Sequence, residues 1–201
     1  MSASRVSIRA DDFDLGAEVA ELRAGDGGVG AVCAFVGTVR ERNDGAVVDS
    51  LELEHYPGMT EAAIESMINE AVRRFGVRAA RVVHRIGPLA PTAQIVLVAV
   101  TAAHRGEAFQ ACEFLMDYLK TQAPFWKKEV GPGGARWVDA RVTDDTALAR
   151  WGIAAANAGA AAAAALDQRA AATSDTPAAA APGLHAGAAP DTLAGALPGK
   201  R

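Results

Sequence analysis

The sequence predicts a domain of the α+β class, in which two main helices pack on a mixed or antiparallel sheet, followed by a disordered C-terminal tail. Three observations support this prediction. Short apolar runs rich in valine are separated by turn residues, as is typical of strands. Two longer segments repeat apolar residues at helical spacing. Beyond Trp151 no aromatic residue occurs, and Ala, Gly and Pro dominate.

The first two strands are predicted within residues 29–55. VGAVCAFVGTV (29–39) is a continuous apolar run with valines, which indicates a buried strand. VVDSLELEH (47–55) alternates leucine with glutamate, which indicates a half-exposed strand. Asn43-Asp44-Gly45 lies between them and has the residues that a tight turn needs, so we expect a hairpin.

Two helices and three further strands follow. The first helix is predicted from Thr60, as N-cap, to Gly76, with an apolar stripe that ends at Phe75. The second helix is predicted from about Arg105 to Gln122, because Pro124 disfavours a helical residue before it. The apolar stripes are Ile64, Met67, Ala71 and Phe75 in the first helix and Ala108, Cys112, Leu115 and Leu119 in the second. The further strands are predicted at 80–87, 93–101 and 135–142.

The predicted folded domain spans residues 1–150, and an Ala/Gly/Pro-rich tail spans 151–201. Such a composition buries too little apolar area to offset the conformational entropy of the chain. We expect the tail to be disordered and to carry no chemistry of its own.

Composition and charge exclude several classes of protein. Of the 201 residues, 50% are hydrophobic and 22% charged, and the net charge is -4. Without a basic excess, the chain is not expected to bind nucleic acid. No apolar run is long enough to span a bilayer, and the N-terminus lacks the apolar core of a signal peptide, so we expect a cytoplasmic protein that binds no membrane.

The two cysteines, Cys33 and Cys112, lie in apolar patterns and are expected to be structural thiols. A disulfide or a metal site would need more cysteines or a recognised spacing. No cofactor and no metal are predicted.

Cations gather around apolar residues in KTQAPFWKKE (120–129). Pro124 ends the helix between Lys120 and Lys127, so the chain can fold back and bring both ammonium groups together. Further cations stand at the ends of predicted elements, where ligand-binding residues often lie. These are Arg40, His104, Arg105 and Arg141. The pattern predicts a local anion-binding pocket.

Simpler explanations stay open on the pattern alone. Lys120 follows Asp117 by three residues and fits a surface ion pair. Lys127 and Lys128 fit solvated charges beside Phe125 and Trp126. His84, inside a predicted strand, fits a structural role better than a catalytic one, and His55 fits the turn before the first helix.

Several blocks in the same order resemble the large, catalytic subunit of molybdopterin synthase. The blocks are FVGTVR (35–40), LELEHYPGMTE (51–61), HRIG (84–87), AHR..AF (103–109), MDYLKTQAPFWKKE (116–129) and RWVDAR (136–141). They cover nearly all of 1–150 and imply an α/β hammerhead-like fold. Pro91-Thr92-Ala93 departs from the glycine-acidic turn that the family has there.

The resemblance implies a sulfurtransferase. Such enzymes insert two sulfurs into cyclic pyranopterin monophosphate and so form the dithiolene of molybdopterin, in molybdenum cofactor biosynthesis. The sulfur arrives as a thiocarboxylate at the C-terminus of a small ubiquitin-like carrier subunit. The family assembly is a heterotetramer built on a homodimer of the large subunit. Both reactants are anionic, which explains a cationic pocket in an acidic protein.

The resemblance also assigns roles to residues. Lys120 is the first candidate for catalysis and Lys127 the second, while Arg40, His104 and Arg105 are assigned to the pterin phosphate and ring. Lys128 and Arg141 are assigned to substrate or carrier, and for Arg141 the sites of its own subunit and of the neighbouring subunit both stay open. The full set implied to bind substrate is Thr38, Val39, Arg40, His104, Arg105, Lys120, Lys127, Lys128, Glu129 and Arg141. The alternative is a non-catalytic subunit of the same fold that binds a phosphate ligand or acts as an adaptor.

Overall fold

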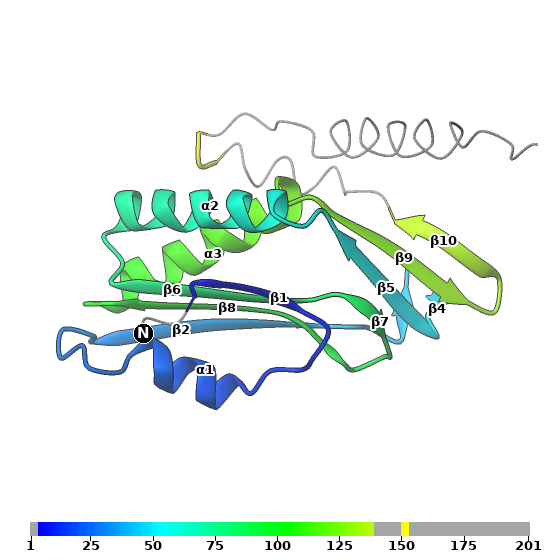
Figure 1. The fold of residues 1–201 in the computed structure, drawn as a ribbon, viewed down its shortest axis with the longest axis horizontal. Helices are drawn as coiled ribbons and strands as arrows, with labels where there is room; N and C mark the ends of the chain where they lie inside the picture. Colours follow the sequence, from blue (N-terminus) through cyan, green and yellow to red (C-terminus); the bar gives the residue numbers. More distant parts are fainter. Residues whose placement is uncertain (1–3, 139–149, 153–201) are drawn as a thin grey trace, which may run out of the picture.

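Three helices and two four-stranded sheets make up most of the residues described, 4–138 and 150–152, in a computed structural model of the chain (Figure 1). In chain order the elements are β1 (Val6–Arg9), α1 (Leu15–Leu22), β2 (Ala31–Thr38), β3 (Arg42–Asn43), β4 (Ala46–Val47), β5 (Ser50–His55), α2 (Met59–Phe75), β6 (Ala79–Arg85), β7 (Gly87–Leu89), β8 (Gln94–Ala102), α3 (Arg105–Thr121), β9 (Phe125–Gly131) and β10 (Gly134–Val138). The predicted α+β class is confirmed.

The first sheet has the strand order β1-β6-β8-β2. β1 runs parallel to β6, and the other neighbours are antiparallel. Helices α2 and α3 cover one face of this sheet, and α1 lies against the other (Figure 1). β8 is buried from Val96 to its end because helices cover both of its faces.

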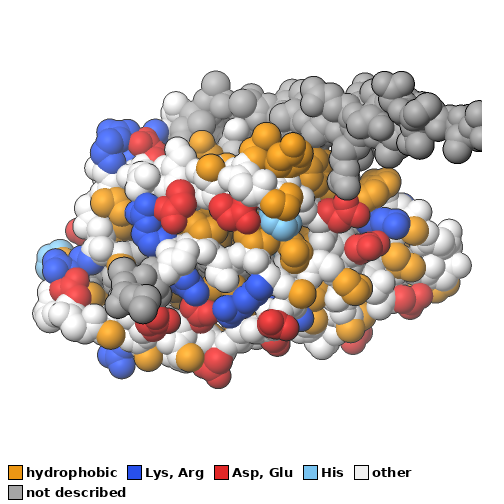
Figure 2. All heavy atoms as spheres, viewed as in Figure 1, with side chains coloured by type: hydrophobic (Ala, Val, Ile, Leu, Met, Phe, Trp, Pro, Cys, Tyr) orange, Lys and Arg blue, Asp and Glu red, His pale blue; other side chains and the backbone are white. Residues whose placement is uncertain are grey.

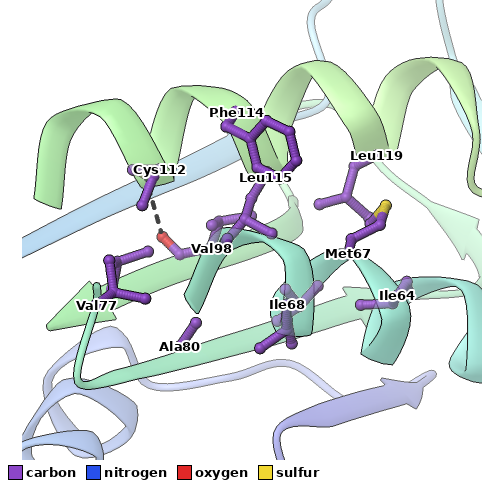
Figure 3. Packing of buried hydrophobic residues seen from close by; sticks show 14 of the residues in the cluster. Ile64, Met67, Ile68, Val77, Ala80, Val98, Cys112, Phe114, Leu115 and Leu119 are labelled. Carbon is purple, nitrogen blue, oxygen red and sulfur yellow. Dashed lines mark hydrogen bonds between the residues drawn. The ribbon is translucent and has the colours of Figure 1, made fainter. Parts of the chain in front are cut away.

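The main core lies between the first sheet and the pair α2 and α3 (Figure 3). Both apolar stripes predicted from the sequence point into it, although Phe75 is only partly buried. Ile64, Met67 and Leu115 are fully buried, and Val98 of β8 faces them. Burying each such side chain stabilises the fold by about 1.5–3 kcal/mol.

The second sheet has the order β10-β9-β5-β7 and is antiparallel throughout. It lies beyond one end of the first sheet, beside the C-terminal end of α3 (Figure 1). Its own small core consists of Val39, Val48, Leu51, Leu53 and Leu89. Since β9 starts directly after α3, this sheet receives the segment in which the predicted lysines lie.

The predicted hairpin between 29–39 and 47–55 is wrong. β2 pairs with β8, while β5 pairs with β7 and β9. The turn at Asp44 and Gly45 forms with the positive φ angles expected of it, 50° and 83°, but it closes only the short pair β3 and β4. β2 is an edge strand of the first sheet, and Val32 and Phe35 are exposed on it, so the predicted burial of this apolar run is also wrong.

Helix α2 begins one residue before the predicted N-cap. Gly58 is the N-cap, and Thr60 lies inside the helix, where its hydroxyl donates to the carbonyl oxygens of Tyr56 (3.0 Å) and Pro124 (3.2 Å). The predicted end is confirmed, since Gly76 adopts a left-handed conformation. Helix α1 and strand β1 were not predicted from the sequence.

The end of the described chain packs on the helices. Trp151 contacts the rings of Phe75 and Phe114 edge-on, at centroid distances of 5.7 and 5.6 Å, and its Nε1 donates to Asp117 Oδ2 (2.8 Å). The rest of the predicted tail, 153–201, lies outside the described residues, as does Arg141. Among the residues described, none of the helices has the length and apolar character needed to cross a membrane.

Candidate active site

The site is built around the junction of α3 and β9. Helix α3 ends at Thr121, and β9 starts at Phe125, so three residues connect them. The Thr121 hydroxyl donates to the Asp117 carbonyl oxygen (2.8 Å), which holds the last turn. The predicted break of the helix between Lys120 and Lys127 is confirmed.

Lys120 stands in the last turn of α3, at a cavity of about 330 Å³ between that helix and β2. The walls include Phe35 and Met116, which keep part of the lysine side chain beside apolar surface. The Asp117 carboxylate, the partner that a simple surface ion pair would use, accepts from Arg150 Nη2 at 2.6 Å and from Trp151 Nε1. Lys120 is thus an exposed residue at the edge of a cavity between two elements.

Strand β9 points alternate residues to opposite faces of the second sheet. Phe125, Lys127 and Glu129 share one face, which we call the inner face; Lys127 stands opposite the buried Leu53 there. The other face, which carries Lys128, we call the outer face.

On the outer face Lys128 stands opposite Glu52 and makes an ion pair with it, with Nζ 3.3 Å from Oε2. Its ammonium also lies 5.7 Å from the centre of the Trp137 ring. Lys127 and Lys128 are neighbours in sequence, yet the strand sends them to different surroundings.

A chain of hydrogen bonds connects Arg40 to the inner face of β9. Arg40 Nη2 donates to Asn43 Oδ1 (2.6 Å), and Asn43 Nδ2 donates to Glu129 Oε1 (2.7 Å). The other Glu129 oxygen accepts from Arg136 Nη2 (2.8 Å) and Nε (3.1 Å). Glu129 is buried, so this network gives both of its carboxylate oxygens hydrogen-bond partners and fixes the loop that carries Arg40.

Aromatic rings line the inner face near Lys127. Phe125 stacks on the buried imidazole of His84, with ring centroids 3.7 Å apart and planes 16° apart. Burial lowers the pKa of His84 to about 3, and the charges of Lys127 and His55 add to this effect. The ring is therefore neutral at physiological pH. His55 Nε2 lies 3.5 Å from Glu61 Oε1 at the start of α2, where the sequence predicted it to act.

The structure does not bring all predicted residues together in one chain. His104 and Arg105 stand at the start of α3, and Lys120 lies fifteen residues beyond Arg105, roughly 22 Å along the helix axis. Arg40 comes shortly after the C-terminal end of β2, where Thr38 pairs with Gln94. The N-terminal end of β2 pairs with Ala102, which is close in sequence to His104. Arg40 therefore lies toward the Lys120 end of the sheet, and His104 and Arg105 at the other end.

Two predicted residues lie at the end of β2. Thr38 is exposed and stands opposite Gln94. Val39 is buried in the second core, and its amide donates to the Ala93 carbonyl oxygen (2.9 Å). Val39 thus anchors the chain immediately before Arg40.

Both cysteines lie on the walls of the Lys120 cavity. Burial raises the pKa of the Cys112 thiol to about 12, with a smaller contribution from neighbouring Cys33. Its Sγ approaches the Val98 carbonyl oxygen at 3.9 Å (Figure 3). A thiol held protonated in this way is a poor nucleophile.

Sequence reasoning missed three residues of this site: Asn43, His84 and Arg136. The sequence pattern places Asn43 in a turn and gives His84 a structural role, and it carries no signal for Arg136. Only pairing across the sheets connects them to Glu129 and Phe125. Positive and negative side chains are interspersed over the face of the molecule shown in Figure 2.

Comparison with known proteins gives a consistent result. Residues 8–122 match the family model described as MoaE protein. The chain is 61% identical over 160 residues to the molybdopterin synthase catalytic subunit of Ralstonia nicotianae, covering 80% of this chain and 91% of that protein. Among solved structures, a molybdopterin biosynthesis MoaE protein from Burkholderia ambifaria is 58% identical with a TM-score of 0.65, covering 75% of this chain and 99% of that one. Molybdopterin synthase from Staphylococcus aureus is 31% identical with a TM-score of 0.63, covering 68% and 98%.

Proposed function

The chain belongs to the MoaE protein family, and we infer that it is the catalytic subunit of a molybdopterin synthase, an enzyme of molybdenum cofactor biosynthesis. Its substrate is then cyclic pyranopterin monophosphate, and its sulfur donor is the C-terminal thiocarboxylate of a small ubiquitin-like carrier subunit. The names of its relatives support a subunit role, and the cationic groups at one end of α3 suit two anionic reactants.

The reaction requires two kinds of help from the protein. The thiocarboxylate sulfur attacks a carbon of the precursor that carries oxygen; a C–O bond at that carbon breaks as the C–S bond forms, and the departing oxygen takes up a proton. The carrier acyl group, then bound through sulfur, leaves when water breaks its bond to sulfur and converts it to a carboxylate. Both steps develop negative charge on oxygen, which nearby ammonium or guanidinium groups stabilise. Two carriers are consumed for each dithiolene.

The observation that carries this proposal is the position of Lys120 and Lys127 on either side of the three-residue connection. Lys120 stands at the cavity beside Phe35 and Met116, and Lys127 projects from the inner face two residues after Phe125. We assign proton transfer to Lys120 first and Lys127 second. Both lysines are exposed in the single chain, so anionic reactants can reach them. It is the bound reactants that would desolvate the ammonium groups and ease release of a proton.

Arg40 binds the pterin phosphate in this proposal. The hydrogen bonds through Asn43 to the buried Glu129 hold the Arg40 guanidinium in place before substrate arrives. Glu129 thus acts on the substrate through Arg40. A planar guanidinium can make two parallel hydrogen bonds to a phosphate. Thr38 and Val39 contribute by setting the course of the chain into Arg40.

His104 and Arg105 reach the same substrate only from a second chain, since they are too far along α3 from Lys120 in their own. The family's homodimer offers such an arrangement. Arg141, outside the described residues, is assigned to substrate or carrier, with the donating subunit left open. Lys128, on the outer face, is assigned to the carrier rather than to the pterin. A cytoplasmic enzyme and a heterotetramer with two carriers remain predictions.

The direct test mixes the chain with thiocarboxylated carrier and the cyclic precursor and measures dithiolene product. We expect product with the natural chain and none with Lys120→Ala, which should still bind carrier. If the natural chain forms no product at saturating carrier but binds the precursor, it is a non-catalytic phosphate-binding subunit instead.

A mixing experiment tests the contribution of the second chain. Lys120→Ala and Arg105→Ala are each expected to be inactive alone. Random pairing makes half the dimers mixed, and each mixed dimer has one of its two sites intact, so about a quarter of natural activity should return. If mixing restores nothing, Arg105 acts in its own chain's site or in none.

A further inference from the structure

We propose that Arg150 and Trp151 are positioning residues for the reaction. They act through Asp117, whose carboxylate they bind on the wall of the Lys120 cavity, and so keep its negative charge from opposing the anionic reactants. The inference rests on the function proposed above, because it takes this cavity as the place where reactants bind. Trp151 belongs to the segment 151–201, for which the sequence predicts no chemistry.

The wall that α3 gives to the cavity carries two carboxylates. Glu113, Asp117 and Lys120 all line it. They stand four and three residues apart in the helix, so they lie along one of its faces. Two carboxylates one turn apart repel each other, and both repel anionic reactants. Lys120 alone does not balance them.

Arg150 supplies the missing positive charge. Its Nη2 lies 2.6 Å from Asp117 Oδ2 and 3.0 Å from Glu113 Oε1, and its Nε lies 3.2 Å from the same Asp117 oxygen. One guanidinium therefore spans both carboxylates. The hydrogen bond to Asp117 raises the pKa of Arg150 above its ordinary value, so the cation is permanent at physiological pH.

Trp151 fixes this arrangement to the helices. Its Nε1 donates to Asp117 Oδ2 at 2.8 Å, and its ring packs edge-on against Phe75 and Phe114. Its carbonyl oxygen accepts from Arg74 Nη1 at 2.6 Å. The Asp117 side chain is only 14% exposed, so the carboxylate is held by two donors and largely covered. The preceding guanidinium is thereby kept at the cavity wall.

The consequence for the cavity is electrostatic. With Arg150 in place, the wall carries two positive and two negative charges; without it, one positive charge faces two negative ones. Charges on a surface act over about 8–10 Å at physiological salt, which reaches a reactant beside Lys120. Arg150 thus lets the positive charge of Lys120 act on the reactants.

A clamp that only fastens the end of the chain predicts something different. Loss of Arg150 would then reduce stability and leave the attraction of anions to the cavity unchanged. An electrostatic role requires that Arg150→Met is harmful only while Glu113 and Asp117 are charged. The triple variant Arg150→Met/Glu113→Gln/Asp117→Asn should therefore reverse the defect of the single variant.

The first measurement needs no turnover. Full-length chain is labelled with trinitrobenzenesulfonate, which is anionic, and with the neutral acetyl ester of N-hydroxysuccinimide, and the rate at each lysine is measured by peptide mass spectrometry. Both reagents attack the unprotonated amine, so the ratio of their rates reports the local potential. At Lys120 this ratio should fall about twofold or more in Arg150→Met and return in the triple variant.

Lys128, which is paired with Glu52 on the second sheet, is the matched control, and its ratio should not change. Thermal melting verifies that each variant is folded at the labelling temperature. An unchanged ratio at Lys120 in Arg150→Met, an equal fall at Lys128, or no return in the triple variant would overturn the proposal. This result does not depend on whether the chain is active.

The second measurement is kinetic. In single turnovers at saturating carrier, Arg150→Met should raise the KM for the precursor about threefold or more, with a smaller change in the maximal rate. The rise should shrink at 0.5 M salt and disappear in the triple variant. Trp151→Phe, which keeps a ring but loses the Nε1 donor, should show a smaller rise. A KM unchanged in Arg150→Met, with rates that follow the folded fraction alone, would show that these residues only fasten the chain.

Discussion

The two faces of strand β9 give consecutive lysines different environments. On the outer face, Lys128 is paired with Glu52 and lies over Trp137, a partly solvated arrangement that contributes about 0–1 kcal/mol. On the inner face, Lys127 projects from the same side of the strand as Phe125 and buried Glu129, and it is itself exposed, whereas Lys128 is half-buried. The comparison teaches that the charge of a residue says little about its role until the strand determines which face it occupies.

The largest effect on turnover is expected at Lys120, in the last turn of α3 just before β9 begins. Lys120→Ala should reduce turnover by about 10³-fold, the upper part of the range for a lost proton-transfer group, while carrier affinity stays within about threefold. Rapid-quench assays and calorimetric titration with carrier measure the two quantities. Loss of folding in this variant would instead return Lys120 to a structural role.

The network behind the inner face should show a smaller effect. Glu129→Gln removes the charge that Arg136 and, through Asn43, Arg40 depend on, so we expect turnover to fall about tenfold and stability by about 1.5–3 kcal/mol. Glu52→Gln is the matched change on the outer face, where we expect at most about 1 kcal/mol. Urea denaturation measures both. Equal losses would remove the distinction between the faces.

The neutral state of His84 predicts a dependence of stability on pH. Its pKa is about 3 in the folded chain and about 6.5 when unfolded, so the unfolded chain binds more protons between these values. Stability should therefore fall as pH drops below 6.5, by up to about 1.4 kcal/mol per pH unit from this group. His84→Phe should remove that part of the slope. Urea denaturation at pH 7 and pH 5.5 tests this, and an unchanged slope in the variant would show that His84 protonates normally.

A smaller stability effect is expected at the turn before β8. Thr92 has a φ of 71°, which a β-branched residue rarely adopts, and the sequence departs from the family's glycine-acidic turn at this place. Thr92→Gly should stabilise the fold by about 1 kcal/mol without changing turnover, because the turn lies outside the inner face. A gain in activity would connect this loop to the site after all.

The sequence predicted those parts of the fold that depend on local pattern. The two apolar stripes, the stop of α2 at Gly76 and the end of α3 before Pro124 all follow from spacing and backbone restrictions. Strand pairing could not be predicted from local pattern, since β2 and β5 are close in sequence yet belong to different sheets. Short α1 was also missed.

The site was predicted in composition but not in arrangement. The resemblance pointed to Arg40, Lys120 and Lys127, but it could not show that β9 separates Lys128 from Lys127 or that α3 separates Arg105 from Lys120. Nor could it connect Asn43 to Glu129, because that contact depends on how the second sheet forms. Long-range pairing, which the sequence does not display, decides these points.

The central claim is that the inner face of β9 performs the chemistry, and one paired measurement tests it most directly. Single-turnover rates of dithiolene formation are compared for Lys127→Ala and Lys128→Ala at saturating carrier and precursor. We predict that Lys127→Ala is slower by about 100-fold or more and Lys128→Ala by less than about threefold. Equal losses, or a greater loss in Lys128→Ala, would contradict the account.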